Sequence, residues 1–142
     1  MVSPQQAAPA ETAARRCVLI VEDNALNMKL FSAMISAQGY DVLQAENGSQ
    51  ALDVARRGHP DLIVMDLQLP DISGLQVTQE LKASEDTREI PIVATTAFTS
   101  PSDEAEIRAS GCDAFMAKPI AISEFLELID VLMAREACAA LV

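Results

Sequence analysis

The sequence predicts one α/β domain of the flavodoxin-like doubly wound class, (βα)5, whose five-stranded parallel sheet has the strand order 2-1-3-4-5. Three observations lead to this prediction. Short apolar runs alternate along the chain with longer segments in which apolar residues recur at helical spacing, the pattern of βαβ units. The apolar runs lack polar alternation, which is typical of strands covered by helices on both faces. A length of 142 residues suits a single core.

The first half of the pattern contains three strands and two helices. The strands are expected at residues 17–21, 40–45 and 62–65, and the helices between them at 26–38 and 49–57. Asn24 is placed to cap the first helix, and Gly39 and Gly58 are placed to end the two helices.

The second half continues the alternation. Helices are expected at about residues 73–84, from 100 to 111 and from 122 to about 135, and strands at 90–96 and 113–117. Ser100, Pro101 and Asp103 form a predicted helix start with a capping box. The segments before and after this domain of residues 16–135 are expected to be a disordered Ala/Pro/Gln-rich tail, 1–15, and a short C-terminal tail, 136–142.

Charge and composition limit the possible partners. The 10 basic and 21 acidic residues give a formal net charge of -11, which disfavours nucleic acid and anionic membranes as partners. No apolar run approaches the ~20 residues that span a bilayer, and residues 1–14 lack the basic start and apolar block of a signal peptide. We therefore expect a cytoplasmic protein. The three cysteines indicate neither a disulfide framework nor a zinc site.

Polar residues stand where the predicted strands end. Glu22 and Asp23 follow the first strand and Asp66 the third, while Thr96 and Lys118 follow the fourth and fifth. In an open parallel sheet these ends meet at the ligand-binding edge. Two carboxylates ~5 Å apart repel by roughly 3 kcal/mol at an effective dielectric of ~20, so a hard cation is needed, and Mg2+ suits oxygen ligands beside a phosphate.

These residue types together describe a carboxylate that accepts a phosphoryl group, with a metal and the Lys118 ammonium neutralising the transferred charge. Plainer interpretations exist for individual positions. Asp66 could simply begin a turn, Glu22 and Asp23 could be a solvated pair, and Thr95 offers the same hydroxyl as Thr96. Phe115 could be an ordinary core residue, and His59, in a loop before Pro60, is expected to be exposed and without a role.

With these marks in order, residues 16–135 resemble the receiver domain of bacterial two-component response regulators. The marks are Glu22-Asp23, Asp66 with Pro70 and Gly74, Thr96-Ala97, and Lys118-Pro119. The resemblance implies that Asp66 is the phosphoacceptor and that Asp23 and Asp66 bind Mg2+ directly. It further implies that Glu22 holds a metal-bound water and that the backbone carbonyl of Gln68 is another ligand.

The resemblance also assigns the residues around the phosphoryl group. Thr96 would bind a phosphoryl oxygen in the active state, Lys118 would pair with it, and Ala97 would leave room for it. Phe115 stands where the family often has a tyrosine that turns inward on activation. The Lys118-Pro119 bond would be cis, as in many members.

The function implied is that of a single-domain response regulator rather than an enzyme, with only self-phosphotransfer and autodephosphorylation as chemistry. The donor would be a histidine kinase or a histidine phosphotransfer protein. Segments 21–31, 71–75, 96–98 and 118–120 are similar to single-domain cell-division regulators in this family, so partners such as cell-cycle or polarity kinases are expected. The seven residues after 135 are too few for an output domain.

Phosphorylation would then bias a binding surface formed by the fourth helix, fifth strand and fifth helix of a monomer. Two alternatives remain open on the sequence. The chain could instead be a phosphorelay intermediate or phosphate sink. It could also be a Mg2+-dependent phosphatase, although many of these carry a second aspartate where this chain has Gln68.

Overall fold

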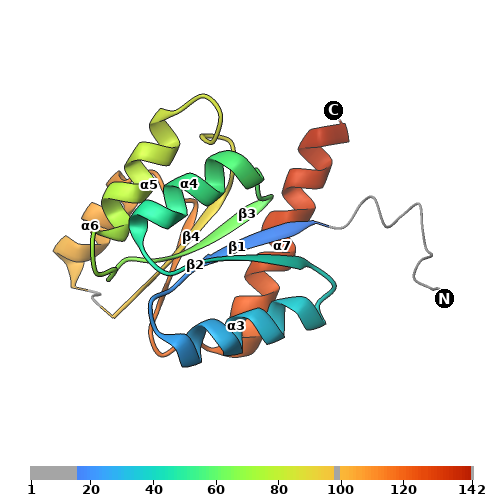
Figure 1. Ribbon diagram of the computed structural model, residues 1–142, viewed down its shortest axis with the longest axis horizontal. Coiled ribbons are helices and arrows are strands. Elements are labelled where there is room, and N and C mark those ends of the chain that lie inside the picture. Colours follow the sequence, from blue (N-terminus) through green and yellow to red (C-terminus); the bar gives the residue numbers. More distant parts are fainter. Residues whose placement is uncertain (1–15, 98–99, 142) are drawn as a thin grey trace.

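The computed structural model describes residues 16–97 and 100–141, with side chains described as far as residue 134. The expected tail of residues 1–15 lies outside the described residues. Helices and strands are named as in Figure 1.

The sheet has five strands in the order β2-β1-β3-β4-β5, and each neighbouring pair is parallel. The strands are β1 (Cys17–Val21), β2 (Asp41–Ala45), β3 (Leu62–Asp66), β4 (Ile92–Thr96) and β5 (Ala114–Ala117). This order confirms the predicted flavodoxin-like doubly wound fold. It also places β1 and β3 side by side at the centre of the sheet, where the strand order reverses.

Helices cover both faces of the sheet (Figure 1). They are α3 (Ala25–Ala37), α4 (Gly48–Gly58), α5 (Gly74–Ala83), α6 (Pro101–Ala109) and α7 (Ile122–Leu141). Helices α4, α5 and α6 pack on one face, and α3 and α7 pack on the other.

The apolar runs show no polar alternation because each central strand contributes side chains to the hydrophobic cores on both faces of the sheet. In β1, Leu19 and Val21 point into the core under α4 and α5, whereas Val18 and Ile20 point into the core under α3 and α7. All four side chains are at most 1% exposed. Burial of such a side chain contributes roughly 1.5–3 kcal/mol relative to leaving it in water, so the central strands hold the two layers together.

Several predicted helix ends are confirmed. The Asn24 side chain accepts a hydrogen bond from the Asn27 N–H, and Ser100 forms the expected capping box with Asp103. Gly39 and Gly111 both have positive φ, 98° and 97°, the left-handed conformation that glycine adopts without a steric cost.

Most element boundaries differ from the prediction by one or two residues, and three of the differences have a clear cause. Helix α4 is closed by His59, which takes the left-handed conformation with φ 46° while Gly58 remains helical. Strand β4 begins at Ile92, because the Ile90 N–H donates to the Thr87 carbonyl and closes a turn. Helix α7 continues to Leu141 instead of ending near Arg135, because its last residues are rich in alanine and contain no glycine or proline.

Across the described residues, none of the helices has both the length and the apolar character that a bilayer crossing requires.

Candidate functional site

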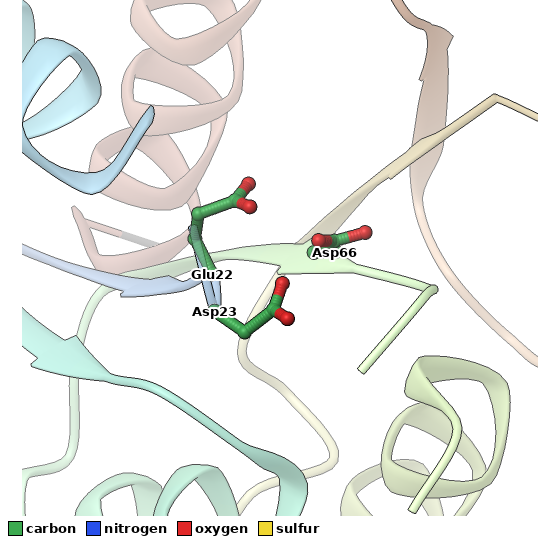
Figure 2. Close-up of side chains that lie close together, drawn as sticks. All are labelled: Glu22, Asp23 and Asp66. Atoms are coloured by element: carbon green, nitrogen blue, oxygen red, sulfur yellow. The ribbon is translucent and has the colours of Figure 1, made fainter. Parts of the chain in front are cut away.

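Three carboxylates gather where β1 and β3 end at the same edge of the sheet. Val21 pairs with Met65 across the two strands, so Glu22 and Asp23 follow β1 directly beside Asp66. One ligand oxygen from each residue lies within 4.8 Å of the others, and Figure 2 shows the three side chains converging. Glu22 and Asp66 are each only 2% exposed, whereas Asp23 is exposed, so the cluster opens to solvent at Asp23.

Lys118 supplies the positive charge of this cluster. Its Nζ lies 3.3 Å from Asp66 Oδ1 and 3.8 Å from Glu22 Oε1. The Lys118 N–H donates to the Thr96 carbonyl at 2.8 Å, which fixes the end of β5 against β4. The Lys118-Pro119 peptide bond is cis, as the family resemblance implies. Three carboxylates facing one ammonium leave a formal excess of negative charge that suits a divalent cation.

Backbone groups bind the two buried carboxylates. Asp66 Oδ1 accepts the Gln68 N–H at 2.9 Å, and Glu22 Oε2 accepts the Asn24 N–H at 3.3 Å. Burial, followed by repulsion from Asp66, raises the pKa of Glu22. The other oxygen, Glu22 Oε1, has no hydrogen-bond partner among the described residues.

A buried carboxylate oxygen without a hydrogen bond is costly unless a cation or water satisfies it. Glu22 Oε1 lies 3.8 Å from Lys118 Nζ but accepts no hydrogen bond among the described residues, so it can accept one from a metal-bound water. Together with the all-oxygen ligand set, it fits Mg2+ with its coordinated waters.

Thr96, at the end of β4, borders an open cavity. Thr96 is 1% exposed and lines a cavity of about 200 Å³ between the end of β3, α5 and α6. Thr95 pairs with Asp66 across the sheet, so these two side chains lie on the same face, and that of Thr96 lies on the other. The cavity therefore leaves room for the predicted contact between Thr96 and a phosphoryl oxygen.

Phe115 is half-buried on β5 and packs against the core under α4, α5 and α6. The Arg108 guanidinium of α6 lies 5.2 Å from the ring centroid, within the range of a cation–π contact. Phe115 thus joins α6 to the sheet. His59 is exposed, as expected.

Three features of the site were not predicted from the sequence. The Gln68 carboxamide oxygen accepts the Ala97 N–H at 3.3 Å, which joins the segments that follow β3 and β4. Asp71, in the loop after β3, binds the start of α4. Gly74 lies so close to the strand end that a Cβ there would be 2.4 Å from the Asp66 carbonyl oxygen. None of these contacts leaves a local sequence signal, because each joins residues from separate elements.

An apolar groove of about 540 Å³ adjoins the cluster and was also not predicted. It lies between α3 and the loop from β5 to α7, and its lining includes Asn27, Leu30, Met34, Lys118, Ile120 and Ile122. Leu30 and Ile122 are 52% and 56% exposed. Lys118 lines this groove and also contacts Asp66, so the groove leads to the carboxylate cluster.

The fold and the carboxylate cluster together define the class of protein to which this chain belongs. The chain belongs to the response regulator receiver family, whose receiver domain model matches residues 18–130. Within that class the chain is similar to the polar-differentiation response regulator DivK of Brucella ovis, with 53% identity over 114 residues, or 80% of this chain and 93% of that protein. The DivK of Brucella anthropi is 52% identical over the same length.

Solved structures agree with this membership. The receiver domain of a sensor histidine kinase from Pseudomonas aeruginosa has 32% identity and a TM-score of 0.78, covering 84% of this chain and 98% of that one. That protein has a magnesium ion coordinated in its active site cleft. The signal receiver domain of a putative Luxo repressor protein from Vibrio parahaemolyticus has 27% identity and a TM-score of 0.81, covering 89% and 96%.

Proposed function

We propose that this chain is a single-domain response regulator that accepts a phosphoryl group on Asp66 from a histidine kinase or a histidine phosphotransfer protein. The observation that carries the proposal is the position of Asp66. It is a buried carboxylate at a strand end, with Lys118 at 3.3 Å and with Glu22 and Asp23 close enough to share a cation. These are the groups that phosphoryl transfer to a carboxylate needs.

In the proposed step, an Asp66 carboxylate oxygen forms a bond to phosphorus as the bond from phosphorus to the donor imidazole nitrogen breaks. The nitrogen keeps the electron pair. Lys118 pairs with a phosphoryl oxygen, and the Thr96 hydroxyl binds another. Hydrolysis of the resulting acyl phosphate by water returns Asp66 to its carboxylate, so the chain acts only on its own phosphoryl group.

Mg2+ has a natural place in this proposal. Asp23 and Asp66 would bind it directly, the backbone carbonyl of Gln68 would be a further ligand, and Glu22 would bind one of its waters. When bound, the ion neutralises charge on the phosphoryl oxygens. The unsatisfied Glu22 Oε1 supports this role, as does the magnesium held by the Pseudomonas relative.

The donor reaches Asp66 from the side of the apolar groove. A donor imidazole must come within bonding distance of Asp66, so the rest of the donor has to cover the surface around the mouth of the site. The groove between α3 and the loop after β5 begins at Lys118 and exposes Leu30 and Ile122. An amphipathic helix of the donor would bury these side chains.

The signal passes to other proteins through the surface of α6, β5 and α7. Binding of Thr96 to the phosphoryl group would fill the cavity next to it, and Phe115 would turn inward from its contact with Arg108. Phosphorylation would thereby favour one of two surface arrangements. The similarity to DivK supports partners such as cell-cycle or polarity kinases, and the proposed protein acts as a cytoplasmic monomer.

The test uses the full chain with Mg2+ and acetyl phosphate, or with a phosphorylated kinase. Intact mass spectrometry should show the addition of one phosphoryl group to the wild type and none to Asp66→Asn. Asp53→Asn is the matched control, because Asp53 is an exposed carboxylate on α4 that pairs with Arg57 away from the site. Full phosphorylation of Asp66→Asn would refute the assignment. Steady hydrolysis of a generic phosphate ester by the wild type would instead support the phosphatase alternative.

A further inference from the structure

The loop between β3 and α5 is joined to a helix that contributes no residue to the carboxylate cluster. Asp71, at the tip of this loop, accepts hydrogen bonds from the Gly48 N–H at 2.7 Å and the Ser49 N–H at 3.1 Å. It also accepts one from the Ser49 hydroxyl at 2.9 Å. Both N–H groups belong to the first turn of α4, where helix N–H groups lack partners within the helix. The loop therefore supplies part of the cap of α4.

The charge of Asp71 strengthens this contact. A carboxylate at a helix N-terminus interacts favourably with the helix dipole, and charged hydrogen bonds are stronger than neutral ones. The Gly48 N–H, with those of Ile72 and Ser49, holds the pKa of Asp71 well below its usual range. Gly48 also permits a close approach, since a Cβ there would lie 2.9 Å from the Ile72 Cβ.

The same loop carries the groups next to the proposed phosphoacceptor. Hydrogen bonds hold both ends of the loop near the end of β3. The Gln68 N–H donates to Asp66 Oδ1, and the N–H of Gly74, the first residue of α5, donates to the Leu67 carbonyl at 3.1 Å. Asp71 is a further attachment, and it is the one that joins the loop to α4, whereas the Gln68 carboxamide joins the loop to the segment after β4. Without Asp71, the part of the loop after Gln68 loses these hydrogen bonds to α4.

We propose that Asp71 is a positioning residue, which holds the loop against α4 so that Gln68 keeps its place beside Asp66. This inference rests on the proposed function, because it concerns the same site. Asp71 is not one of the three clustered carboxylates, and its hydrogen bonds go to α4, so its effect passes through the loop. A group that hydrogen-bonds a metal ligand directly changes metal affinity by 10–100-fold; for Asp71 we expect roughly 3- to 10-fold.

The test compares two residues that cap the same helix. Asn47 accepts the Gln50 N–H at 2.9 Å, so Asn47→Ala removes a cap of α4 without touching the loop. Asp71→Ala removes both the cap and the loop attachment. Urea denaturation of the full chain should show similar losses of stability for the two variants. Mg2+ titration by calorimetry should show the weaker affinity in Asp71→Ala alone, with a matching fall in the rate of phosphorylation by acetyl phosphate.

A conservative variant separates position from charge. Asp71→Asn keeps one acceptor oxygen for the Gly48 N–H, and its Mg2+ affinity should lie between those of the wild type and Asp71→Ala. It also provides a folded variant if Asp71→Ala does not fold. Equal Mg2+ affinities in the wild type, Asn47→Ala and both Asp71 variants would overturn the inference. An equal loss of Mg2+ affinity in Asn47→Ala and Asp71→Ala would overturn it as well. A wild type that binds no Mg2+ and accepts no phosphoryl group would refute the proposed function itself.

Discussion

Lys118 Nζ lies 3.3 Å from Asp66 Oδ1, so the end of β5 places an ammonium group against the carboxylate at the end of β3. The same Nζ is 3.8 Å from Glu22, and the Lys118 side chain is 23% exposed. Lys118 thus offsets the repulsion between two buried carboxylates. A cation that binds the same carboxylates has to do so in the presence of this charge.

Replacing Lys118 should therefore change metal binding and phosphorylation in opposite directions. One positive charge ~5 Å from a divalent ion opposes its binding by about 1.5 kcal/mol even at the dielectric of water, or roughly tenfold in affinity. Lys118→Gln should bind Mg2+ more tightly, by calorimetric titration, yet accept a phosphoryl group from acetyl phosphate more slowly. Lys82→Gln is the control, because Lys82 pairs with Asp113 outside the cluster. Weaker Mg2+ binding by Lys118→Gln would contradict the electrostatic account.

Mg2+ should stabilise the folded chain, because the three carboxylates come together only when β1 and β3 pair. A ligand at 100 times its Kd that binds only the folded state adds about 2.7 kcal/mol to the free energy of unfolding. Thermal denaturation with and without Mg2+ measures this as a rise in Tm. Asp23→Ala should reduce the rise, whereas Asp53→Ala should not. An undiminished rise in Asp23→Ala would place the metal elsewhere.

Gly74→Ala should damage the site through the backbone. The added Cβ would lie 2.4 Å from the Asp66 carbonyl oxygen and 2.6 Å from the Leu67 Cα, so the strand end must move. We expect a loss of about 2 kcal/mol in the free energy of unfolding, as for other overpacked positions, and slower phosphorylation of the folded variant. Urea denaturation checks the first effect. Gly39→Ala is the control that introduces backbone strain without crowding. Gly39 has positive φ, and a Cβ added there would meet no described atom within 4 Å.

The sequence was sufficient for the fold and for the residues at the strand ends. Parallel strands send all their carboxyl ends to one edge, so Glu22, Asp23 and Asp66 could be placed together from the order of the strands alone. A buried strand and the acidic residue that follows it are local features, so both can be recognised in the sequence.

Contacts between separate elements could not be predicted in the same way. The attachment of Asp71 to Gly48 depends on how far the loop after β3 reaches over α4. The exposure of Leu30 depends on what covers its helix, since its spacing in the sequence also suits burial. The left-handed conformation of His59 replaced the expected role of Gly58 because the helix continues one residue further.

The single tyrosine, Tyr40, should report directly on the contact between α7 and the segment that joins α3 to β2. Burial, followed by a 2.7 Å hydrogen bond from the Tyr40 hydroxyl to Asp130, raises the pKa of Tyr40 to about 12. Since this value lies above the usual 10, the neutral phenol stabilises the fold below pH 10, and this contribution is lost as the pH rises from 10 to 12. Absorbance of the tyrosinate measures the pKa cleanly, because the chain has one Tyr and no Trp.

Asp130→Asn should lower the pKa of Tyr40 while leaving it above 10, because burial still acts on the phenol. Circular dichroism at each pH shows whether the chain is still folded. An unchanged pKa in Asp130→Asn would mean that the hydrogen bond does not contribute.

Leu30 should matter for transfer from a protein donor and not for transfer from a small molecule. Leu30 is 52% exposed and lines the groove that leads to Lys118, so a docked donor would bury it. The minority of interface side chains whose truncation costs more than about 1 kcal/mol of binding free energy cluster near the centre of an interface, where a donor over this groove would place Leu30. Leu30→Ser should therefore slow phosphorylation by a histidine kinase that phosphorylates the wild type, by roughly fivefold or more.

Val131→Ser is the matched control, since Val131 is 53% exposed on α7 and is absent from the groove lining. Phosphorylation by acetyl phosphate should be unchanged in both variants, because a small donor needs only the carboxylate cluster. Equal rates from the kinase for the two variants would place the donor on another surface.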